Sequence, residues 1–268
     1  MRVVITRPAG DAFVWVSALE TAGHTALSLP LIEVGPAADP QPVANAWTHW
    51  PEWDAVMFVS AQAVRYFFQQ PPRAGMNEQW AVGPRCWATG PGTHKALRDA
   101  GVPEACIDSP SADAMQFDSE ALWQRVGAQV TAGQQILIVR GNDVEEATGT
   151  PDESATAGTG RDWLAQQIQA NGAAAHFVVA YERRRPNWPA AQQAMARQAA
   201  EDGSVWCFSS SQAIRHLGMA LPDTAWSQAR CIATHARIAE TAQALGFGEV
   251  YLARPSVGDV LRSLESLA

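Results

Sequence analysis

The side chains best placed for chemistry in this sequence are hydroxyls and arginines that follow short apolar runs. In parallel α/β domains, ligands bind beyond the carboxyl ends of the strands, where loops and helix N-termini converge. Helix N-termini favour anions, and arginine forks hold carboxylates with paired hydrogen bonds. We therefore expect anion binding by the residues after these runs, namely Thr6-Arg7, Ser60, Thr89 to Thr93, Arg140-Gly141-Asn142, Ser209 to Ser211 and Thr234 to Arg237.

These residues contain no familiar arrangement for strong acid–base or nucleophilic catalysis. No serine stands in a G-x-S-x-G pattern, no His-x-x-x-His occurs, and the segment from Gly90 to Lys95 fits neither the dinucleotide-binding nor the P-loop template. The sequence thus disfavours a hydrolase, a kinase or a dehydrogenase.

The elements that must position these residues alternate between short apolar runs and helix-length segments. That alternation predicts α/β architecture with parallel strands and helices on both sheet faces. The expected helices are 12–22, 61–69, 94–100, 162–170 and 237–245, most of them ending at Gly. The expected strands are 3–5, 25–29, 55–59, 86–89, 105–107, 136–139, 174–179, 205–208, 231–233 and 250–252.

An internal repeat indicates two copies of one five-stranded unit. Residues 58–65 (FVSAQAVR) match residues 208–215 (FSSSQAIR), and residues 85–89 match 230–234. The opening strand also pairs with residues 137–140. The order of the matching segments indicates that the chain begins one domain, forms the whole second domain and then returns to the first. We therefore expect a discontinuous domain of 1–36 plus 184–268 and an inserted domain of 37–183.

The two expected crossings lie within residues 30–42 and 181–189. Tyr181 lies at the second crossing. Its side chain is either buried in the packing between elements, or its hydroxyl faces a cleft, where a phenol could act as a weak proton donor. The run Arg183 to Arg185 is a solvated hinge if it binds nothing. Ser60 and Ser210 stand where helices begin, so a cap alone and a cap with ligand contact are equally open, and His94 and His235 are expected at the surface.

Residues 143–160 break the pattern, because they are acidic, small and poor in apolar side chains. Such a segment cannot bury enough surface to order itself. We expect a mobile loop, either a tolerated insertion or a lid over a cleft, with the insertion favoured.

Composition narrows the functional classes further. The 268 residues carry a net charge of −8, which argues against a broad nucleic-acid interface. The four cysteines show no ligand spacing for zinc, and the N-terminal apolar run is too short for a signal peptide or membrane span. These features are typical of a reduced cytoplasmic protein without membrane contact.

Several motifs in order resemble the uroporphyrinogen-III synthase family. They are VVITRPAGD at 3–11, LETAGHTALSLPLIEV at 19–34, IVRGN at 138–142, RDWL at 161–164, NGAAAHFVVAYER at 171–183, CFSSSQAI at 207–214 and CIATHARIAETAQALGF at 231–247. The resemblance covers nearly the whole chain except residues 143–160. It implies two flavodoxin-like domains, each a doubly wound parallel five-stranded sheet, joined by a two-stranded linker.

The resemblance also implies an activity. Members cyclise hydroxymethylbilane, a linear tetrapyrrole with eight carboxylates, to uroporphyrinogen III with loss of water and inversion of ring D, using no cofactor and no metal. A monomer acting as a lyase in haem biosynthesis, with transient contact with hydroxymethylbilane synthase, would follow. No nucleic acid or membrane partner is expected.

Position by position, the resemblance makes Tyr181 the candidate for assisting hydroxide departure. Carboxylate-holding positions are Arg7, Ser60, Thr93, Arg140, Gly141, Asn142 and Ser210. The chain departs from the family at residues 234–238 (THARI), where a hydroxyl contact is missing and Arg237 could replace it as a carboxylate clamp.

A negatively charged protein must bind this anionic substrate through local cations. We expect Arg7, Arg140, Arg161, Arg183 to Arg185 and Arg237 to ring one cleft. The alternative functions are a two-domain small-molecule binding protein with the same hinge and cleft, and an inactive paralogue.

Overall fold

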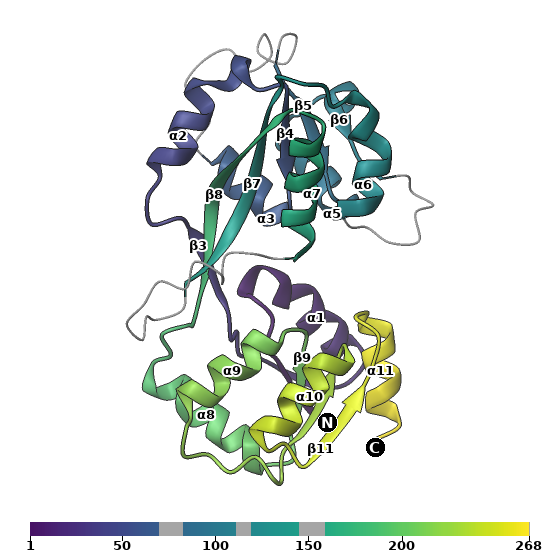
Figure 1. The fold of residues 1–268 in the computed structure, drawn as a ribbon. Helices are drawn as coiled ribbons and strands as arrows, with labels where there is room; N and C mark the ends of the chain where they lie inside the picture. The colour runs from purple at the N-terminus through teal and green to yellow at the C-terminus, as the bar shows by residue number, and fades with distance from the viewer. Residues whose placement is uncertain (70–82, 111–118, 145–158, 268) are drawn as a thin grey trace. The chain divides into compact units, whose positions relative to one another are not determined.

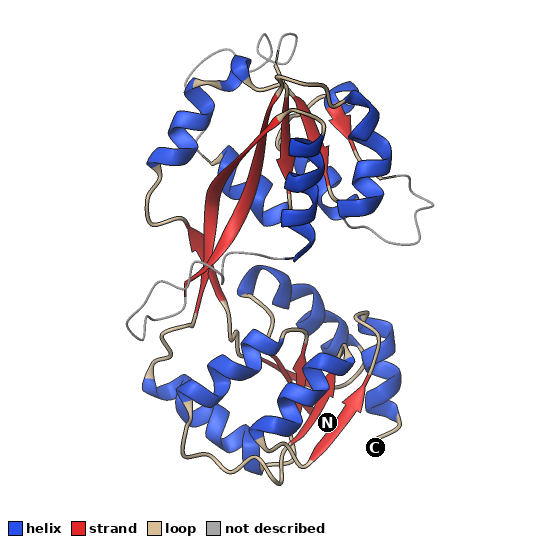
Figure 2. Ribbon diagram, viewed as in Figure 1, coloured by secondary structure: helices blue, strands red, loops and turns tan. Residues whose placement is uncertain are grey.

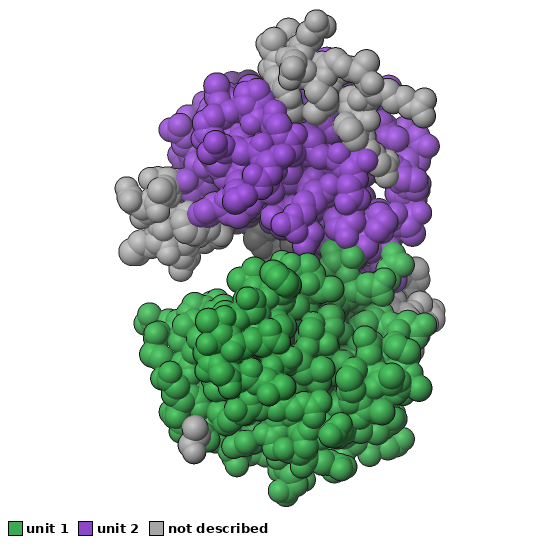
Figure 3. Space-filling model, turned by 180° about the vertical axis from the view of Figure 1, so that it is seen from behind, with its two compact units in different colours: residues 1–34, 184–268 green, residues 35–183 purple. Residues whose placement is uncertain are grey.

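The computed structural model describes residues 1–69, 83–110, 119–144 and 159–267. The chain divides into two compact units, coloured separately in Figure 3. Unit 1 comprises residues 1–34 and 184–268, and unit 2 comprises residues 35–183. The unit limits differ by two residues, at the first crossing, from the domains proposed above.

Unit 1 is a parallel sheet with helices on both faces (Figures 1 and 2). Its strand order is β11-β10-β9-β1-β2, and β9 lies in the centre between β10 and β1. Numbered along the chain, this is the 2-1-3-4-5 order of flavodoxin-like folds. The strands are β1 (Arg2–Ile5), β2 (Thr25–Ser28), β9 (Val205–Phe208), β10 (Arg230–Ala233) and β11 (Glu249–Leu252), and the helices are α1 (Ala9–Thr21), α8 (Ala190–Glu201), α9 (Ser211–Ala220), α10 (Ala236–Leu245) and α11 (Val257–Glu265).

The core of unit 1 follows from alternation along its strands. Successive strand residues point to opposite faces, so a strand covered on both sides needs apolar residues throughout. Trp206 and Phe208 pack on the face covered by α8, α9 and α10. Val205 and Cys207 pack on the opposite face with side chains of α1 and α11.

Unit 2 repeats this topology in a cyclically permuted order. The six strands of its described part have the order β3-β8-β7-β4-β5-β6. If β7 is counted first, β8-β7-β4-β5-β6 is again 2-1-3-4-5, with β4 and β5 in the places of β9 and β10. The strands are β3 (Glu33–Pro36), β4 (Ala55–Phe58), β5 (Arg85–Ala88), β6 (Ile107–Asp108), β7 (Gln135–Val144) and β8 (Ala174–Arg184), and the helices are α2 (Gln41–Thr48), α3 (Ala61–Phe68), α5 (Pro91–Asp99), α6 (Ser119–Val126) and α7 (Thr159–Ala170), with short 3₁₀ turns at Trp50–Glu52, Glu104–Cys106 and Gly127–Gln129.

The two faces of the unit 2 sheet bury different side chains. On one face, Met57 and Ile138 pack with residues of α6 and α7. On the other, Phe58 meets Phe67 of α3 edge-on, and Trp47 stacks with Trp50. The Trp47 indole N–H donates to the carbonyl oxygen of Phe67, which satisfies that buried polar group.

The prediction of α/β architecture with parallel sheets is confirmed, but several limits were wrong. β7 continues past its apolar run through Val144 and β8 through Arg184, because pairing with neighbouring strands keeps these mostly polar segments in the sheet. Residues 104–106 form a 3₁₀ turn, and β6 begins only at Ile107. The expected linker contains β3, which adds a sixth strand to the sheet of unit 2.

The predicted loop 143–160 was wrong at both of its ends. Residues 143–144 finish β7 and residues 159–160 begin α7, while 145–158 lie outside the described residues. In the part of the chain that the structure describes, no helix is long and apolar enough to cross a membrane.

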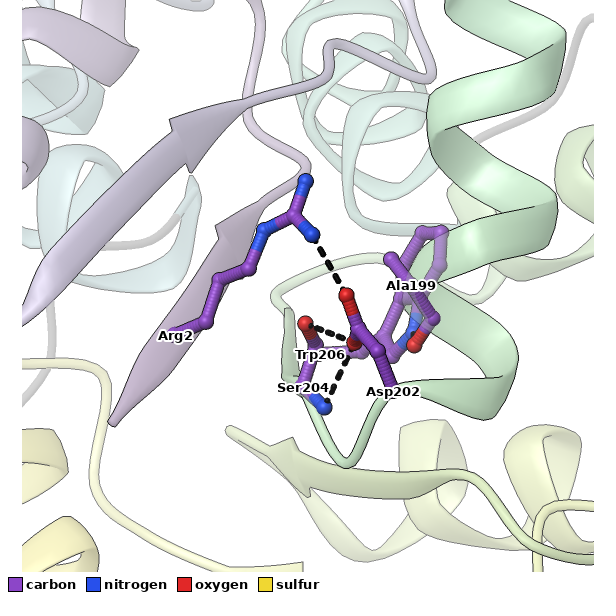
Figure 4. A network of polar contacts seen from close by, with 5 residues as sticks. All are labelled: Arg2, Ala199, Asp202, Ser204 and Trp206. Carbon is purple, nitrogen blue, oxygen red and sulfur yellow. Dashed lines mark hydrogen bonds and ion pairs between the residues drawn. The ribbon is translucent and has the colours of Figure 1, made fainter.

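A polar network fastens the amino ends of two central strands in unit 1 (Figure 4). Arg2 at the start of β1 forms an ion pair with Asp202, which follows α8. The same carboxylate accepts hydrogen bonds from the backbone N–H and the hydroxyl of Ser204, just before β9. The network therefore joins β1 to the α8–β9 turn.

Candidate active site

The candidate residues of unit 2 gather around Tyr181 on β8. The Tyr181 side chain is only 1% exposed. Its ring lies against Gly141 of the neighbouring strand β7, where an added Cβ atom would come within 2.3–2.7 Å of the ring carbons. On another side the ring stacks with that of Tyr66 from α3, with centroids 5.9 Å apart.

The Tyr181 hydroxyl is held by two side chains. Arg183, two residues along the same strand, donates to it at 2.7 Å. The hydroxyl of Ser60 lies 3.1 Å away, and Ser60 stands two residues after the end of strand β4. The three residues come from β8 and from the β4–α3 connection, so the sheet itself brings them together.

Arg183 is anchored in turn by Asp143 on β7, whose carboxylate accepts a hydrogen bond of 3.1 Å from its guanidinium. Burial alone would lower the pKa of Arg183, but the Tyr181 and Asp143 oxygens outweigh that effect and raise the pKa. The guanidinium therefore stays charged beside the Tyr181 oxygen.

Ser60 is also the N-cap of helix α3. Its backbone is extended, and its hydroxyl oxygen accepts the N–H of Ala63 at 3.1 Å. The cap satisfies one of the free N–H groups at the helix start. The same oxygen also contacts the Tyr181 hydroxyl, and contact of Ser60 with a ligand stays a prediction.

The remaining candidates of unit 2 lie within a strand or a helix and not in the loops that follow the strands. Arg140, Gly141 and Asn142 lie within β7 rather than after it, since the strand continues to Val144. The Arg140 guanidinium lies over the ring of Phe177, 4.6 Å from its centroid. Thr93 lies in the first turn of α5 and is 5% exposed, with its hydroxyl 3.4 Å from that of Thr89.

The candidates of unit 1 lie beside the carboxyl end of its central strand β9. Arg7 follows β1 and lies over the indole of Trp15, 4.2 Å from the ring centroid. Burial lowers the pKa of Arg7, with Asp11 and Cys207 acting in the opposite direction. Ser210 is the N-cap of α9, although no side-chain capping hydrogen bond forms there.

The segment that departs from the family pattern, residues 234–238, starts helix α10. His235 is the N-cap, and its ring nitrogen accepts the backbone N–H of Arg237 at 3.3 Å. An imidazole thus caps α10, whereas the corresponding helix of unit 2, α5, begins at Gly90 without a side-chain cap. Arg237 lies in the first turn, where its carbonyl oxygen accepts from Thr241.

The expected ring of arginines divides between the units. Arg7, Arg184, Arg185 and Arg237 belong to unit 1, and Arg140 and Arg183 belong to unit 2. The side chain of Arg161 lies outside the described residues. A single ring around one cleft stays a prediction.

Two residues around Tyr181 were missed by the sequence analysis, Asp143 and Tyr66. Asp143 had been assigned to a loop, so its place two residues from Gly141 on one strand face was not considered. Continuing the strand through 140–144 would have indicated it. Tyr66 on α3 had no distinguishing signal in the sequence.

A hollow of about 560 Å³ lies beside α5 in unit 2 and is lined by none of these candidates. Its cations are matched by carboxylates: Lys95 pairs with Asp99 at 2.6 Å, and Arg98 pairs with Glu104 at 3.3 Å. Among the described residues, no three His, Cys, Asp or Glu side chains group as a metal site would require.

Comparison with known proteins decides the family. The model of the family described as uroporphyrinogen-III synthase HemD matches residues 14–148 and 154–262. The chain belongs to the uroporphyrinogen-III synthase family. The family resemblance drawn from the sequence motifs is thereby confirmed.

Relatives named uroporphyrinogen-III synthase match over the full length. The protein of Salmonella typhimurium strain LT2 is 29% identical, and that of Escherichia coli strain K12 is 27% identical, each over 99% of this chain and 100% of the relative. The uroporphyrinogen-III synthetase structure from Helicobacter pylori 26695 is 17% identical, covers both chains fully and has a TM-score of 0.56. A Thermus thermophilus uroporphyrinogen III synthase mutant is 12% identical over 99% of this chain and 98% of that one, with a TM-score of 0.50. These two structures share the fold.

Proposed function

We propose that this chain is an active uroporphyrinogen-III synthase, which cyclises hydroxymethylbilane to uroporphyrinogen III with loss of water and inversion of ring D. The observation that carries the proposal is the hydrogen-bonded array of Tyr181, Ser60 and Arg183, found in a chain that the family model matches along most of its length. The array supplies hydroxyl protons beside a fixed cation, which suits a reaction that needs little proton chemistry.

In the proposed reaction, the ring A hydroxymethyl group loses water and leaves an azafulvenium cation. The substituted α carbon of ring D attacks this cation to give a spiro pyrrolenine, which fragments and recloses at the free α carbon. Because the free bilane closes unaided to isomer I, the protein acts mainly by holding the two ends so that the substituted carbon attacks first. The Tyr181 hydroxyl is the proposed source of the proton that assists hydroxide departure.

The substrate carboxylates are the proposed ligands of the remaining candidates. Arginine forks and helix N-termini both suit carboxylates, since each presents N–H donors toward an anion. Arg7, Ser210 and Arg237 would serve in unit 1, and Ser60, Thr93, Arg140, Gly141 and Asn142 in unit 2. The reaction is that of a lyase without a cofactor. A cytoplasmic monomer that receives the bilane through transient contact with hydroxymethylbilane synthase completes the proposal.

The product isomer tests the proposal. The purified protein is given hydroxymethylbilane generated in situ by a deaminase, and the oxidised uroporphyrins are separated by chromatography. We expect isomer III to predominate. Isomer I alone, at the spontaneous rate, would refute the proposal and favour a binding protein or an inactive paralogue.

The Tyr181→Phe variant tests the residue assignment in the same assay. Without the phenol proton, formation of isomer III should slow by about tenfold or more. The thermal unfolding midpoint should stay close to that of the unaltered chain, because the ring and its packing remain. Undiminished turnover would remove Tyr181 from the mechanism.

A further inference from the structure

The hydrogen-bond direction at Tyr181 follows from what each partner can donate. A guanidinium has only N–H donors, so the Tyr181 oxygen accepts the bond of 2.7 Å from Arg183. Among the described residues, the acceptor within reach of the Tyr181 O–H is the oxygen of Ser60 at 3.1 Å. The reverse direction would leave a buried O–H group without a partner, which is unfavourable. The tyrosine proton therefore points at Ser60.

The Ser60 oxygen then uses both of its lone pairs as acceptors. One accepts the Tyr181 O–H, and the other accepts the backbone N–H of Ala63 at the start of α3. The serine's own proton is left to point away from both donors. Ser60 is half-buried while Tyr181 is almost fully enclosed, so Ser60 carries the more accessible proton of the pair.

From this geometry we infer that Ser60 is a catalytic residue, which delivers the proton to the departing hydroxyl group while Tyr181 stands behind it as the proton's source. The inference rests on the proposed function and deepens it, and for Ser60 it replaces the carboxylate contact given there with a contact to the departing hydroxyl group. Arg183, fastened by Asp143, is a positioning residue that fixes the direction of the Tyr181 hydroxyl.

The proton transfer balances in a single concerted step. The carbon–oxygen bond of the ring A hydroxymethyl group breaks with the electron pair leaving on oxygen, and that oxygen takes the Ser60 proton to become water. Ser60 takes the Tyr181 proton at once, and the resulting phenolate lies beside the Arg183 cation. After the macrocycle closes, the α carbon of ring D loses its proton and the pyrrole ring regains its aromaticity. This proton returns through Ser60 to Tyr181.

Removal of the Ser60 hydroxyl is the direct test. Ser60→Ala should lower kcat by about 100-fold with little change in KM, because one general-acid contribution is lost. Ser60→Thr keeps both the hydroxyl and the helix cap and should recover much of the rate. Unaltered kcat in Ser60→Ala would overturn the inference.

A matched control separates catalysis from helix capping. Ser256 caps helix α11 in unit 1 and accepts the N–H of Asp259 at 3.1 Å, the same distance as in the Ser60 cap. Ser256→Ala should lose comparable stability while kcat stays unchanged. If Ser256→Ala slows turnover as much as Ser60→Ala does, capping explains the loss and the inference fails.

A change of leaving group separates proton delivery from substrate binding. A bilane carrying aminomethyl in place of hydroxymethyl is already protonated at neutral pH, so its leaving group departs as ammonia and needs no acid. Ser60→Ala should be slow with hydroxymethylbilane and should process the aminomethyl analogue at nearly the rate of the unaltered chain. An equal loss with both substrates would overturn proton delivery.

Arg183 is tested by separating kcat from KM. Arg183→Gln should lower kcat about tenfold at nearly constant KM, since it weakens the orientation of a general acid, and Arg183→Lys should restore part of the rate. A raised KM with unchanged kcat would make Arg183 a carboxylate ligand instead.

The isomer assay distinguishes failure of the proposed function from failure of the relay. If the unaltered chain yields only isomer I, both proposals fail. If the unaltered chain yields isomer III and Ser60→Ala keeps full activity, only the relay is overturned.

Discussion

Gly141 determines how closely the Tyr181 ring can lie against strand β7. Its sequence neighbours, Arg140 and Asn142, suggest a ligand-binding turn, yet Gly141 lies inside a strand. A Cβ atom there would overlap the tyrosine ring at 2.3–2.7 Å. The absence of a side chain at this position is therefore required for the ring to reach the hydroxyl of Ser60.

Gly141→Ala should consequently displace Tyr181 and break its hydrogen bonds. Crowding of a packed site typically costs about 1–3 kcal/mol of stability, and we expect at least a tenfold loss of kcat in addition. Thermal unfolding and the isomer III assay measure the two effects. Gly92→Ala is the stability control, because a Cβ atom there meets nothing within 4 Å, and it should not destabilise the chain. An active Gly141→Ala variant of normal stability would show that the ring has room to move.

At the scale of elements, the Asp202 network joins strand β1 to the turn between α8 and β9 (Figure 4). Partial burial alone would raise the pKa of Asp202, but hydrogen bonds from Ser204 and the charge of Arg2 lower it overall. A carboxyl group with a lowered pKa in the folded state stabilises that state while it is ionised. Its contribution is present above the unfolded pKa of about 3.9 and is lost as the pH falls through the folded value.

Asp202→Asn should therefore destabilise the chain in a pH-dependent way. Because the side chain is 26% exposed, we expect a loss of about 1 kcal/mol at pH 7 rather than the larger value of a buried charged hydrogen bond. Denaturant unfolding of both proteins between pH 7 and pH 3 measures the difference, which should shrink on acidification. A difference that is constant with pH would mean that charge plays no part.

The elements were predictable where burial alone decides them. Strand β9 was predicted with its observed limits, because all four of its residues are apolar and buried. Strands β7 and β8 were cut short, since their polar ends are held by pairing with neighbouring strands and not by burial. Hydrophobic patterns carry no signal for such pairing.

The candidate site was predictable as a set of strand-end positions but not as contacts. Ser60 and Tyr181 were each identified, yet their hydrogen bond depends on how far β8 extends beside β7. The same extension brings Asp143 to Arg183. Sequence spacing within one strand can indicate shared faces, whereas distances between strands depend on sheet register.

At the scale of the whole molecule, the permuted topology means that the two units differ in whether one continuous stretch of chain contains all of their strands. Unit 2 is one continuous stretch with its own sheet and core, while unit 1 needs both ends of the chain. Its central strand β9 pairs with β1 on one side and β10 on the other. Residues 184–268 alone would leave one edge of β9 unpaired.

A fragment of residues 35–183 should thus fold by itself, with a cooperative thermal transition followed by circular dichroism. A fragment of residues 184–268 should not, because it lacks β1, β2 and α1. Joining residues 184–268 to residues 1–34 through a flexible linker should restore a cooperative transition. An unfolded 35–183 fragment would contradict the independence of unit 2.

The insertion of unit 2 between β2 and α8 also sets an order of events during synthesis on the ribosome. At about 5–20 residues per second, the strand–helix–strand segment at the N-terminus waits roughly ten seconds or more before its partner β9 is made. During that interval the apolar residues Val3, Val4 and Ile5 can pair only with β2 and lack β9 on their other side, although all three are fully buried in the finished chain. The nascent polypeptide therefore carries an exposed strand edge while unit 2 is already able to fold, and such an edge is open to non-native pairing.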